Sequence, residues 1–194
     1  ALEGTIFIAG AGVQWLRDKI KFIKKASDTE KIAKSLSSNK GIYLVPAFTG
    51  LGAPYWNVNA RGILTGLTRD TGPKEITRAT IESVAYQTYD LFEAMKNDGL
   101  KPKLIKVDGG MVLNNWFSQF LSDTINTKVL RPKVNETTAL GAAFMAGLQI
   151  GVYKSLKDIA KNWQADKSFK PKIKNSDRKI LIDGWSKAIK KTLS

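Results

Sequence analysis

The sequence contains no cysteine and no histidine among its 194 residues. These two absences exclude cysteine nucleophiles, disulfides, Cys/His zinc sites, iron–sulfur clusters and the usual histidine general base. No apolar run approaches the roughly 20 residues that a membrane-spanning helix needs, so we expect no membrane insertion. Any acid–base role in this chain therefore falls to Asp, Glu, Lys or Tyr.

Negative charge is also scarce, because 17 Asp and Glu stand against 31 Lys and Arg, a formal net charge of +14. More than half of the excess lies in residues 152–194. A basic chain can bind nucleic acid by neutralising phosphates, which leaves a non-catalytic nucleic-acid-binding module as one alternative function. However, the basic residues of 17–25 fall on several faces of one predicted helix, and no aromatic residues are interleaved with them as a stacking platform. We therefore predict no nucleic-acid partner.

The start of the chain has neither an initiator Met nor a basic leader. Ala1 opens directly on an apolar run that carries the acidic Glu3. A secretory signal would need a positively charged first segment. We expect a cytoplasmic protein whose natural sequence begins upstream of Ala1.

The body of the chain alternates short β-like runs with helical patterns. Pro73 fits the first turn of a long helix that extends to about Asn97. Such alternation is typical of an α/β domain with a mixed or mostly parallel sheet. Residues 49–62 contain too many Gly, Pro and Asn for regular structure. The predicted strands are 5–9, 42–48, 63–67, 104–107 and 127–130, and the predicted helices are 13–25, 73–97, 114–125 and 138–150.

The tail is predicted to be a polar connection over 164–175 followed by a helix over 177–192. Ile180, Leu181, Trp185 and Ile189 recur near helical spacing. The tail helix should therefore dock by one apolar face and leave its lysines in solvent.

Two predicted strand-to-helix junctions contain glycines. Residues 9–12 (AGAG) precede Gln14, and residues 108–110 (DGG) precede Asn114. Helix N-termini present free N–H groups to anions, and glycines let a flat ring or a phosphate approach the backbone closely. Two such junctions facing one crevice would suit a nucleotide. Ordinary turns and, for Asn114, helix capping explain the same residues, and neither junction matches the Walker or G-x-G-x-x-G pattern.

Carboxylates suited to catalysis are few, and no two form a pair that spacing marks as an active site. Asp108 is the most suggestive, since it stands beside the glycines of 108–110, but a role in the turn, or in supporting residues that contact a ligand, suits it better than that of a general base. We expect the others to lie on solvated faces or at helix caps: Glu82, Asp90, Glu93, Asp123 and Glu136.

Four longer stretches carry a family resemblance: PAFTGLGAPYWNVNARGILTGLTR (46–69), RATIESVAYQTYDLFEAM (78–95), VDGGMVLNNWFSQFLSD (107–123) and ETTALGAAFMAGLQIG (136–151). With the opening 18 residues, they resemble the glycerol kinases of the FGGY carbohydrate kinase family over nearly the whole chain. The GLGAPYW segment is the specific part. Asn57 stands where the family usually has Asp, which should affect only local turn bonding. Met111 stands where a small residue is common, and its thioether should narrow or cover the slot for adenine.

The resemblance implies a two-domain enzyme of the actin-like ATPase superfamily with a ribonuclease-H-like core in each domain. This chain would be most of the C-terminal, nucleotide-binding domain, an α/β unit with a mixed sheet flanked by helices and its first strands missing. Residues 1–151 would form the ATP-binding half. Residues 152–194 would be a basic helical extension packed on the same domain.

The resemblance also implies phosphorylation of glycerol to sn-glycerol 3-phosphate, with ATP as phosphoryl donor and Mg²⁺ accompanying the nucleotide. Gly10 and Gln14 would lie along the nucleotide, and Gly110 and Asn114 would flank adenine and ribose. The catalytic Asp, the phosphate loops and the glycerol contacts are expected upstream of Ala1. We therefore assign no catalytic and no metal-binding residue here, and expect this chain to be inactive alone. Another sugar kinase of the family, acting on a pentulose or hexulose, is the alternative enzyme, and a homo-oligomer is compatible with either.

Overall fold

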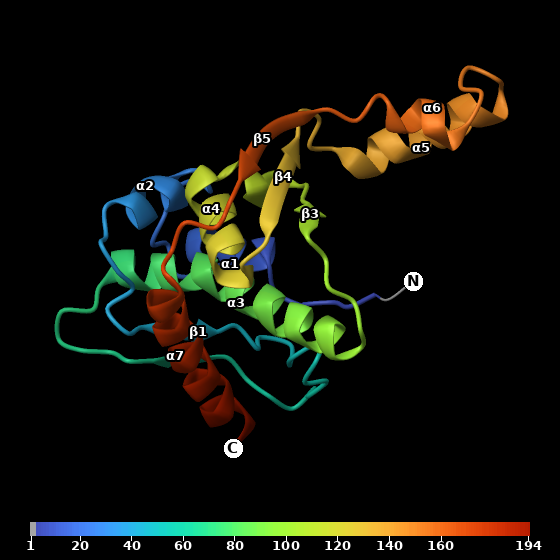
Figure 1. Ribbon diagram of the computed structural model, residues 1–194. Helices are drawn as coiled ribbons and strands as arrows, with labels where there is room; N and C mark the ends of the chain where they lie inside the picture. Colours follow the sequence, from blue (N-terminus) through green and yellow to red (C-terminus); the bar gives the residue numbers. More distant parts are fainter. Residues whose placement is uncertain (1–2) are drawn as a thin grey trace.

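The structure is a computed structural model that describes residues 3–194 (Figure 1). The order of elements confirms an α/β chain. The elements are α1 (Gly10–Asp18), α2 (Asp28–Lys34), β1 (Tyr43–Val45), β2 (Ile63–Thr65), α3 (Pro73–Asn97), β3 (Leu104–Lys106), the short 3-10 helix η1 (Gly110–Leu113), α4 (Asn115–Ile125), β4 (Lys128–Pro132), α5 (Thr137–Gln149), α6 (Leu156–Ala160), β5 (Ala165–Phe169) and α7 (Asn175–Leu193).

The long helix α3 runs through the middle of the molecule (Figure 1). It begins at Pro73 and ends at Asn97, as the sequence predicted. The backbone N–H of Gly72 donates to the Glu75 carboxylate at 3.1 Å, so the helix start is held by its own third residue. α3 packs against α1, α2, α4 and β1, and its residues 77–87 are all buried. This helix is therefore the scaffold that fixes the others relative to one another.

The main sheet has three strands in the order β3-β4-β5 and is mixed. β3 is parallel to β4, with Leu104 opposite Lys128, whereas β5 is antiparallel to β4, with Val129 opposite Phe169. A separate antiparallel pair joins β1 to β2. β5 was not predicted, because four of its five residues are exposed and its sequence lacks an apolar alternation. The segment predicted as a polar connection thus contains a strand.

Two predictions near the start of the chain are wrong. Residues 5–9 form no strand; the segment is instead held by single bonds, such as the Gln87 amide donating to the Ile8 carbonyl at 3.2 Å. The helix predicted over 13–25 begins earlier and ends at Asp18, and Lys21 has a left-handed backbone with φ of 60°. A second helix, α2, then follows. It was not predicted, because its seven residues are too few to show a clear hydrophobic periodicity.

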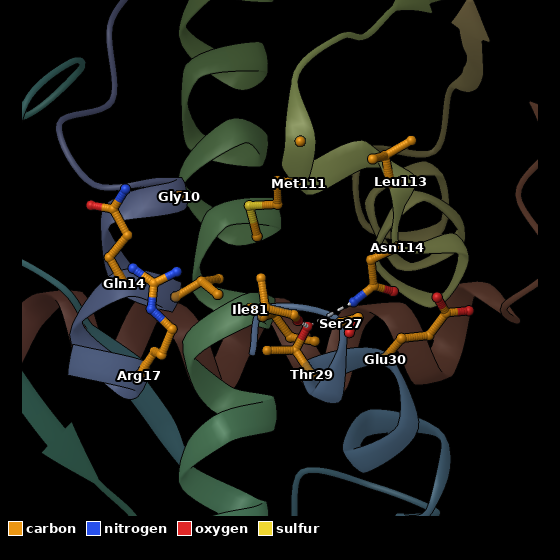
Figure 2. A pocket seen from close by; sticks show the side chains of 13 residues that line it. Gly10, Gln14, Arg17, Ser27, Thr29, Glu30, Ile81, Met111, Leu113 and Asn114 are labelled. Carbon is orange, nitrogen blue, oxygen red and sulfur yellow. Dashed lines mark hydrogen bonds between the residues drawn. The ribbon is translucent and has the colours of Figure 1, made fainter. Parts of the chain in front are cut away.

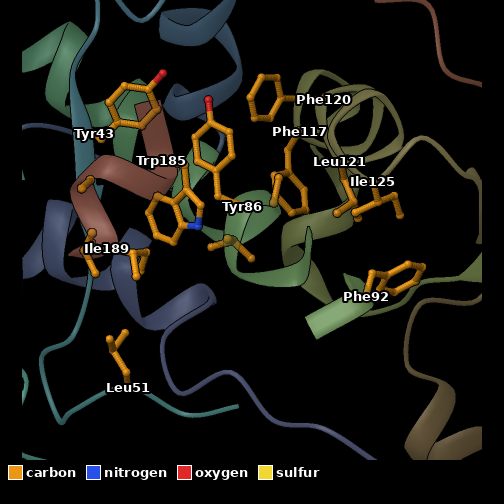
Figure 3. Packing of buried hydrophobic residues seen from close by; sticks show 14 of the residues in the cluster. Tyr43, Leu51, Tyr86, Phe92, Phe117, Phe120, Leu121, Ile125, Trp185 and Ile189 are labelled. Carbon is orange, nitrogen blue, oxygen red and sulfur yellow. The ribbon is translucent and has the colours of Figure 1, made fainter. Parts of the chain in front are cut away.

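The core is aromatic at its centre (Figure 3). The rings of Tyr86 and Trp185 stack at 5.3 Å between centroids, and Phe120 meets Tyr86 edge-on at 5.6 Å. Trp185 has no exposed surface, so α7 is anchored in the core as predicted. Ile180, however, is 67% exposed and does not belong to the docking face.

Two carboxylates expected on solvated faces or at helix caps are withdrawn from solvent, Glu82 fully and Asp90 in part. Glu82 is fully buried, where it accepts a hydrogen bond from the Arg78 guanidinium at 2.7 Å. Asp90 accepts one from the Trp185 indole at 2.6 Å. The prediction failed because helical spacing places both residues on the inner face of α3, and their partners come from side chains that spacing alone does not pair.

The helices α5 and α6 extend away from the rest of the molecule (Figure 1). Within α5, Gly147 alone is buried, and a Cβ there would lie 2.9 Å from the Tyr153 ring. Tyr153, which follows the end of α5, thus packs closely against the helix at this glycine. Among residues 3–194, no helix is long and apolar enough to cross a membrane.

Candidate functional site

The two glycine junctions converge on one cavity of about 440 Å³ (Figure 2). Its lining comes from the first two turns of α1, the segment 26–30, Ile81 of α3, η1 and the start of α4. Gly10, Gln14, Gly110 and Asn114 all belong to this lining. The structure therefore brings together the four residues that the sequence singled out, although 96 residues separate Gln14 from Gly110.

The glycines leave open space on the cavity side. A Cβ built on Gly10 or on Gly110 would meet no protein atom within 4 Å. No side chain caps the N-terminus of α1, so backbone N–H groups at its first turn are available to an acceptor. Gly109, with φ of 86°, has the left-handed conformation that glycine adopts without strain. Both junctions thus leave room for a ligand on the cavity side.

The side walls of the cavity are largely apolar. Val13 of α1, Ile81 of α3, Met111 and Leu113 of η1 supply them. Met111 reaches into the cavity, as its position after the glycines suggested (Figure 2). Apolar walls with a few polar groups at the ends are the ordinary setting for a flat heteroaromatic ligand.

Asn114 plays the capping role that the sequence left open, and it also lines the cavity. Its Oδ1 accepts from the backbone N–H of Phe117 at 2.9 Å, which satisfies one free donor of α4. Its Nδ2 donates to the hydroxyl of Thr29 at 3.2 Å. A single side chain therefore joins the start of α4 to α2 across one end of the cavity.

Sequence reasoning missed the contribution of α2. Thr29 and Glu30 line the cavity together with Ser27, which precedes the helix. The spacing of Ser27 and Glu30 matches the S-x-x-E pattern that often marks a helix start, so this signal was present in the sequence. In the structure Asp28 holds the entry instead, since its carboxylate accepts from the backbone N–H of Lys25 at 3.0 Å.

The charges near the cavity are paired. Burial by itself would raise the pKa of Glu30, but the hydrogen bond and charge of Lys34, 2.5 Å away, outweigh it and hold that pKa below its usual range. Arg17 pairs with Asp18 at 2.6 Å on the exposed side. No group of three or more Asp or Glu side chains within residues 3–194 is placed to hold a metal ion. The cavity is therefore of mixed polarity, and Glu30 is the one carboxylate among the described residues that line it.

The sequence analysis also made predictions for Asp108 and Asn57. The Asp108 carboxylate accepts a hydrogen bond from the Thr137 hydroxyl, and the next residue, Gly109, donates its N–H to the Asn135 carbonyl at 3.2 Å. Asp108 thus fastens the junction to the start of α5, through a contact between residues far apart in the sequence. The Asn57 side chain accepts from the backbone of Asn59 and Ala60 at 2.9 Å each, which is local turn bonding as expected.

The match to a protein family settles what this architecture is. Residues 1–150 match the C-terminal domain of the FGGY family of carbohydrate kinases. The chain belongs to this family. The resemblance noted in the sequence is confirmed, and the fold is the ribonuclease-H-like type of the actin-like ATPase superfamily, with its mixed sheet flanked by helices.

Curated FGGY relatives match this chain over its whole length. The glycerol kinase of Ectopseudomonas mendocina is 54% identical over 195 residues, which cover 100% of this chain and 39% of the relative. The glycerol kinase of Gluconobacter oxydans is 50% identical over 195 residues and is covered to 38%. This chain therefore spans about two fifths of the length of these curated relatives.

Solved structures of FGGY kinases share the fold. A crystal structure of Plasmodium falciparum glycerol kinase with ADP superposes with a TM-score of 0.87 at 37% identity, covering 97% of this chain and 38% of that one. A ligand-bound xylulose kinase from Lactobacillus acidophilus superposes with a TM-score of 0.78 at 25% identity, covering 96% and 38%. The architecture is thus common to kinases that differ in their named substrates.

Proposed function

We propose that this chain is the nucleotide-binding part of an ATP-dependent kinase that phosphorylates glycerol to sn-glycerol 3-phosphate. The observation that carries the proposal is the convergence of both glycine junctions, with Gln14 and Asn114, on one cavity. The ADP-bound structure with the same fold supports a nucleotide as its ligand. Identities of 50–54% with proteins named glycerol kinase support glycerol as the acceptor.

In this proposal Gly10 and Gln14 lie along the nucleotide, and Gly110 and Asn114 flank its adenine and ribose. The missing side chains at Gly10 and Gly110 give the ligand direct access to backbone N–H groups, and the apolar walls suit the base. Phosphoryl transfer depends mainly on positioning and on stabilising charge. The contribution of this chain is therefore to hold and orient the donor.

Mg²⁺ enters the proposal with the nucleotide. The residues described here do not fit a protein-built magnesium site, because Glu30 is the only carboxylate lining the cavity and is paired with Lys34. Magnesium commonly binds through substrate phosphates and a few carboxylates, retaining water. No residue of this chain is assigned to it, and we propose that the catalytic Asp and the glycerol contacts lie in the part of the relatives' length that this chain does not match.

We also propose a division at residue 151. Residues 1–151 would hold the nucleotide, and 152–194 would pack on the same domain, which the pairing of β5 with β4 and the burial of Trp185 support. A cytoplasmic location and a homo-oligomer remain part of this proposal, as they follow from the family.

Adding a methyl group at Gly110 tests whether the cavity binds the nucleotide. Gly110→Ala in the protein at its natural full length should leave folding intact, since the added methyl meets no protein atom within 4 Å. We expect the dissociation constant for ADP, measured by calorimetry with Mg²⁺, to rise about tenfold or more because the methyl occupies ligand space. The matched control is Gly141→Ala in α5, where a Cβ also meets nothing and the cavity is distant. Equal ADP affinity in wild type and Gly110→Ala would remove this junction from the nucleotide contacts.

A substrate test separates glycerol from the sugars of the wider family. The full-length protein, assayed by coupling ADP release to a reporter enzyme, should turn over glycerol with a kcat/KM at least a hundredfold above that for xylulose. The shared fold with xylulose kinases makes the comparison necessary. Turnover of xylulose without turnover of glycerol would overturn the substrate assignment and leave the kinase assignment standing.

A further inference from the structure

Asn114 is held on both of its polar atoms by segments far apart in the sequence. Its Oδ1 accepts from the Phe117 N–H at 2.9 Å, and its Nδ2 donates to the Thr29 Oγ1 at 3.2 Å. Thr29 in turn donates its hydroxyl hydrogen to the Ala26 carbonyl at 2.7 Å. The three contacts form a chain from the segment before α2 to the first turn of α4, at the edge of the cavity (Figure 2).

The direction of these hydrogen bonds fixes the orientation of the Asn114 amide. A hydroxyl has one hydrogen, and that of Thr29 goes to Ala26, so only a lone pair faces Asn114. The nitrogen of the amide must therefore point to Thr29, while its oxygen points to the Phe117 N–H. A flipped amide would set oxygen against a lone pair and N–H against N–H. Neither contact would then be a hydrogen bond.

This orientation decides what Asn114 offers to a ligand. An amide nitrogen carries two hydrogens, and within residues 3–194 the structure gives Nδ2 one acceptor, Thr29. The second N–H is left for the cavity. A ligand atom that faces Asn114 there must be an acceptor, such as a ribose hydroxyl oxygen or a ring nitrogen of a nucleoside.

We propose that Thr29 is a positioning residue of the nucleotide site, which it serves by holding the Asn114 amide with its N–H toward the ligand. This rests on the proposed nucleotide-binding function. Thr29 is only 3% exposed, so its hydroxyl acts through Asn114 and not as the main contact to the ligand. The hydrogen bond also fixes α2 to α4, the two elements that close this end of the cavity.

The test compares two threonines with like local bonding. Thr29→Val in the full-length protein keeps the shape of the side chain but removes the acceptor for Asn114. We expect the dissociation constant for ADP with Mg²⁺ to rise about 3- to 10-fold, as loss of one hydrogen bond implies. Thr29→Ser, which retains the hydroxyl, should stay within about twofold of wild type. Thr124→Val is the matched control, since Thr124 is 2% exposed and its hydroxyl bonds only to the Phe120 carbonyl of its own helix, at 2.7 Å.

A double-substitution cycle with Asn114→Ala gives a readout that a merely structural role would not move. If Thr29 acts through Asn114, adding Thr29→Val to Asn114→Ala should weaken ADP binding no further. Effects that multiply, or equal affinities for Thr29→Val, Thr124→Val and wild type, would overturn the positioning role.

The same variants separate failure of this inference from failure of the proposed function. Wild type that shows no affinity for ADP would overturn the nucleotide function and, with it, the role of Thr29 in binding. In that case urea unfolding of the same cycle still reports on the hydrogen bond itself. Coupled unfolding midpoints would show that Thr29 and Asn114 hold α2 to α4, and independent midpoints would overturn that contact also.

Discussion

Replacing Asp90 by Asn should alter the pH dependence of stability in a defined direction. Burial raises the pKa of this carboxyl to about 6, and the hydrogen bonds from Trp185 and Tyr55 offset only part of that effect. The Trp185 indole donates to it at 2.6 Å. Asn keeps an oxygen for this donor and carries no charge, so the substitution isolates the energetic effect of ionisation.

The magnitude follows from the difference between the folded and unfolded pKa. The unfolded value is about 3.9, so the shift is about 2 units, which corresponds to about 3 kcal/mol at most. Because the folded pKa is the higher one, the folded state holds the proton between about pH 4 and pH 6 while the unfolded state releases it. Wild-type stability from this group is therefore fully present below pH 4 and is lost as the pH rises through 6.

The assay is urea unfolding of wild type and Asp90→Asn between pH 4 and pH 8, followed by tryptophan fluorescence. We expect the free energy of unfolding of the Asn variant, relative to wild type, to rise by up to about 3 kcal/mol from pH 4 to pH 7. Asp70→Asn, at an exposed site, is the control substitution. A difference for Asp90→Asn that stays constant within about 0.5 kcal/mol across this range would refute the reasoning.

Two further substitutions probe the core. Arg78→Met should lower the free energy of unfolding by about 3–5 kcal/mol in a urea titration, because it leaves the buried Glu82 carboxylate without its cation, and the double variant Arg78→Met/Glu82→Leu should recover most of the loss. If the double variant were no more stable than Arg78→Met, an unpaired Glu82 charge would not be the cause of the loss. Trp185→Ala should cost about 3–5 kcal/mol in the same titration, since the indole has no exposed surface and stacks on Tyr86, whereas Lys187→Ala on the exposed side of α7 should change stability by no more than about 0.5 kcal/mol. A small loss for Trp185→Ala would show that α7 is not anchored through this residue.

The parts of the fold that were predictable are those whose information is local. Pro73 and the apolar face that follows it define α3 to the residue, and 115–125 was predicted as a helix for the same reason. Short elements carry less local information from which they could be predicted. The seven residues of α2 contain too few turns for a periodic pattern, and β5 exposes four of its five residues, so neither leaves a hydrophobic signature. The segment 5–9 shows the reverse error, because it is apolar but forms no strand, and of its residues only Ile8 is buried.

The glycines and amides of the candidate site could be predicted from the sequence, but the contribution of α2 to one end of the cavity could not. Glycines after two β-like runs pointed to the junctions with Gly10, Gln14, Gly110 and Asn114, and the resemblance added the role of each toward the nucleotide. The role of α2 could not be read in this way. Thr29 and Asn114 are 85 residues apart, and nothing in the local sequence of either specifies the other as its hydrogen-bond partner.

The sequence by itself determined the family of this protein and the kinds of side chain that this chain can offer to chemistry. The absence of Cys and His removed whole reaction types, and the stretches over 46–69 and 107–123 placed the chain among the FGGY carbohydrate kinases. Only the tertiary structure decided which side chains share an environment. Glu82 is buried, Asp90 accepts from Trp185, and Asn114 donates to Thr29 because α3, α4, α7 and α2 pack together. Such long-range contacts depend on the arrangement of whole elements and not on the residues beside them in the chain.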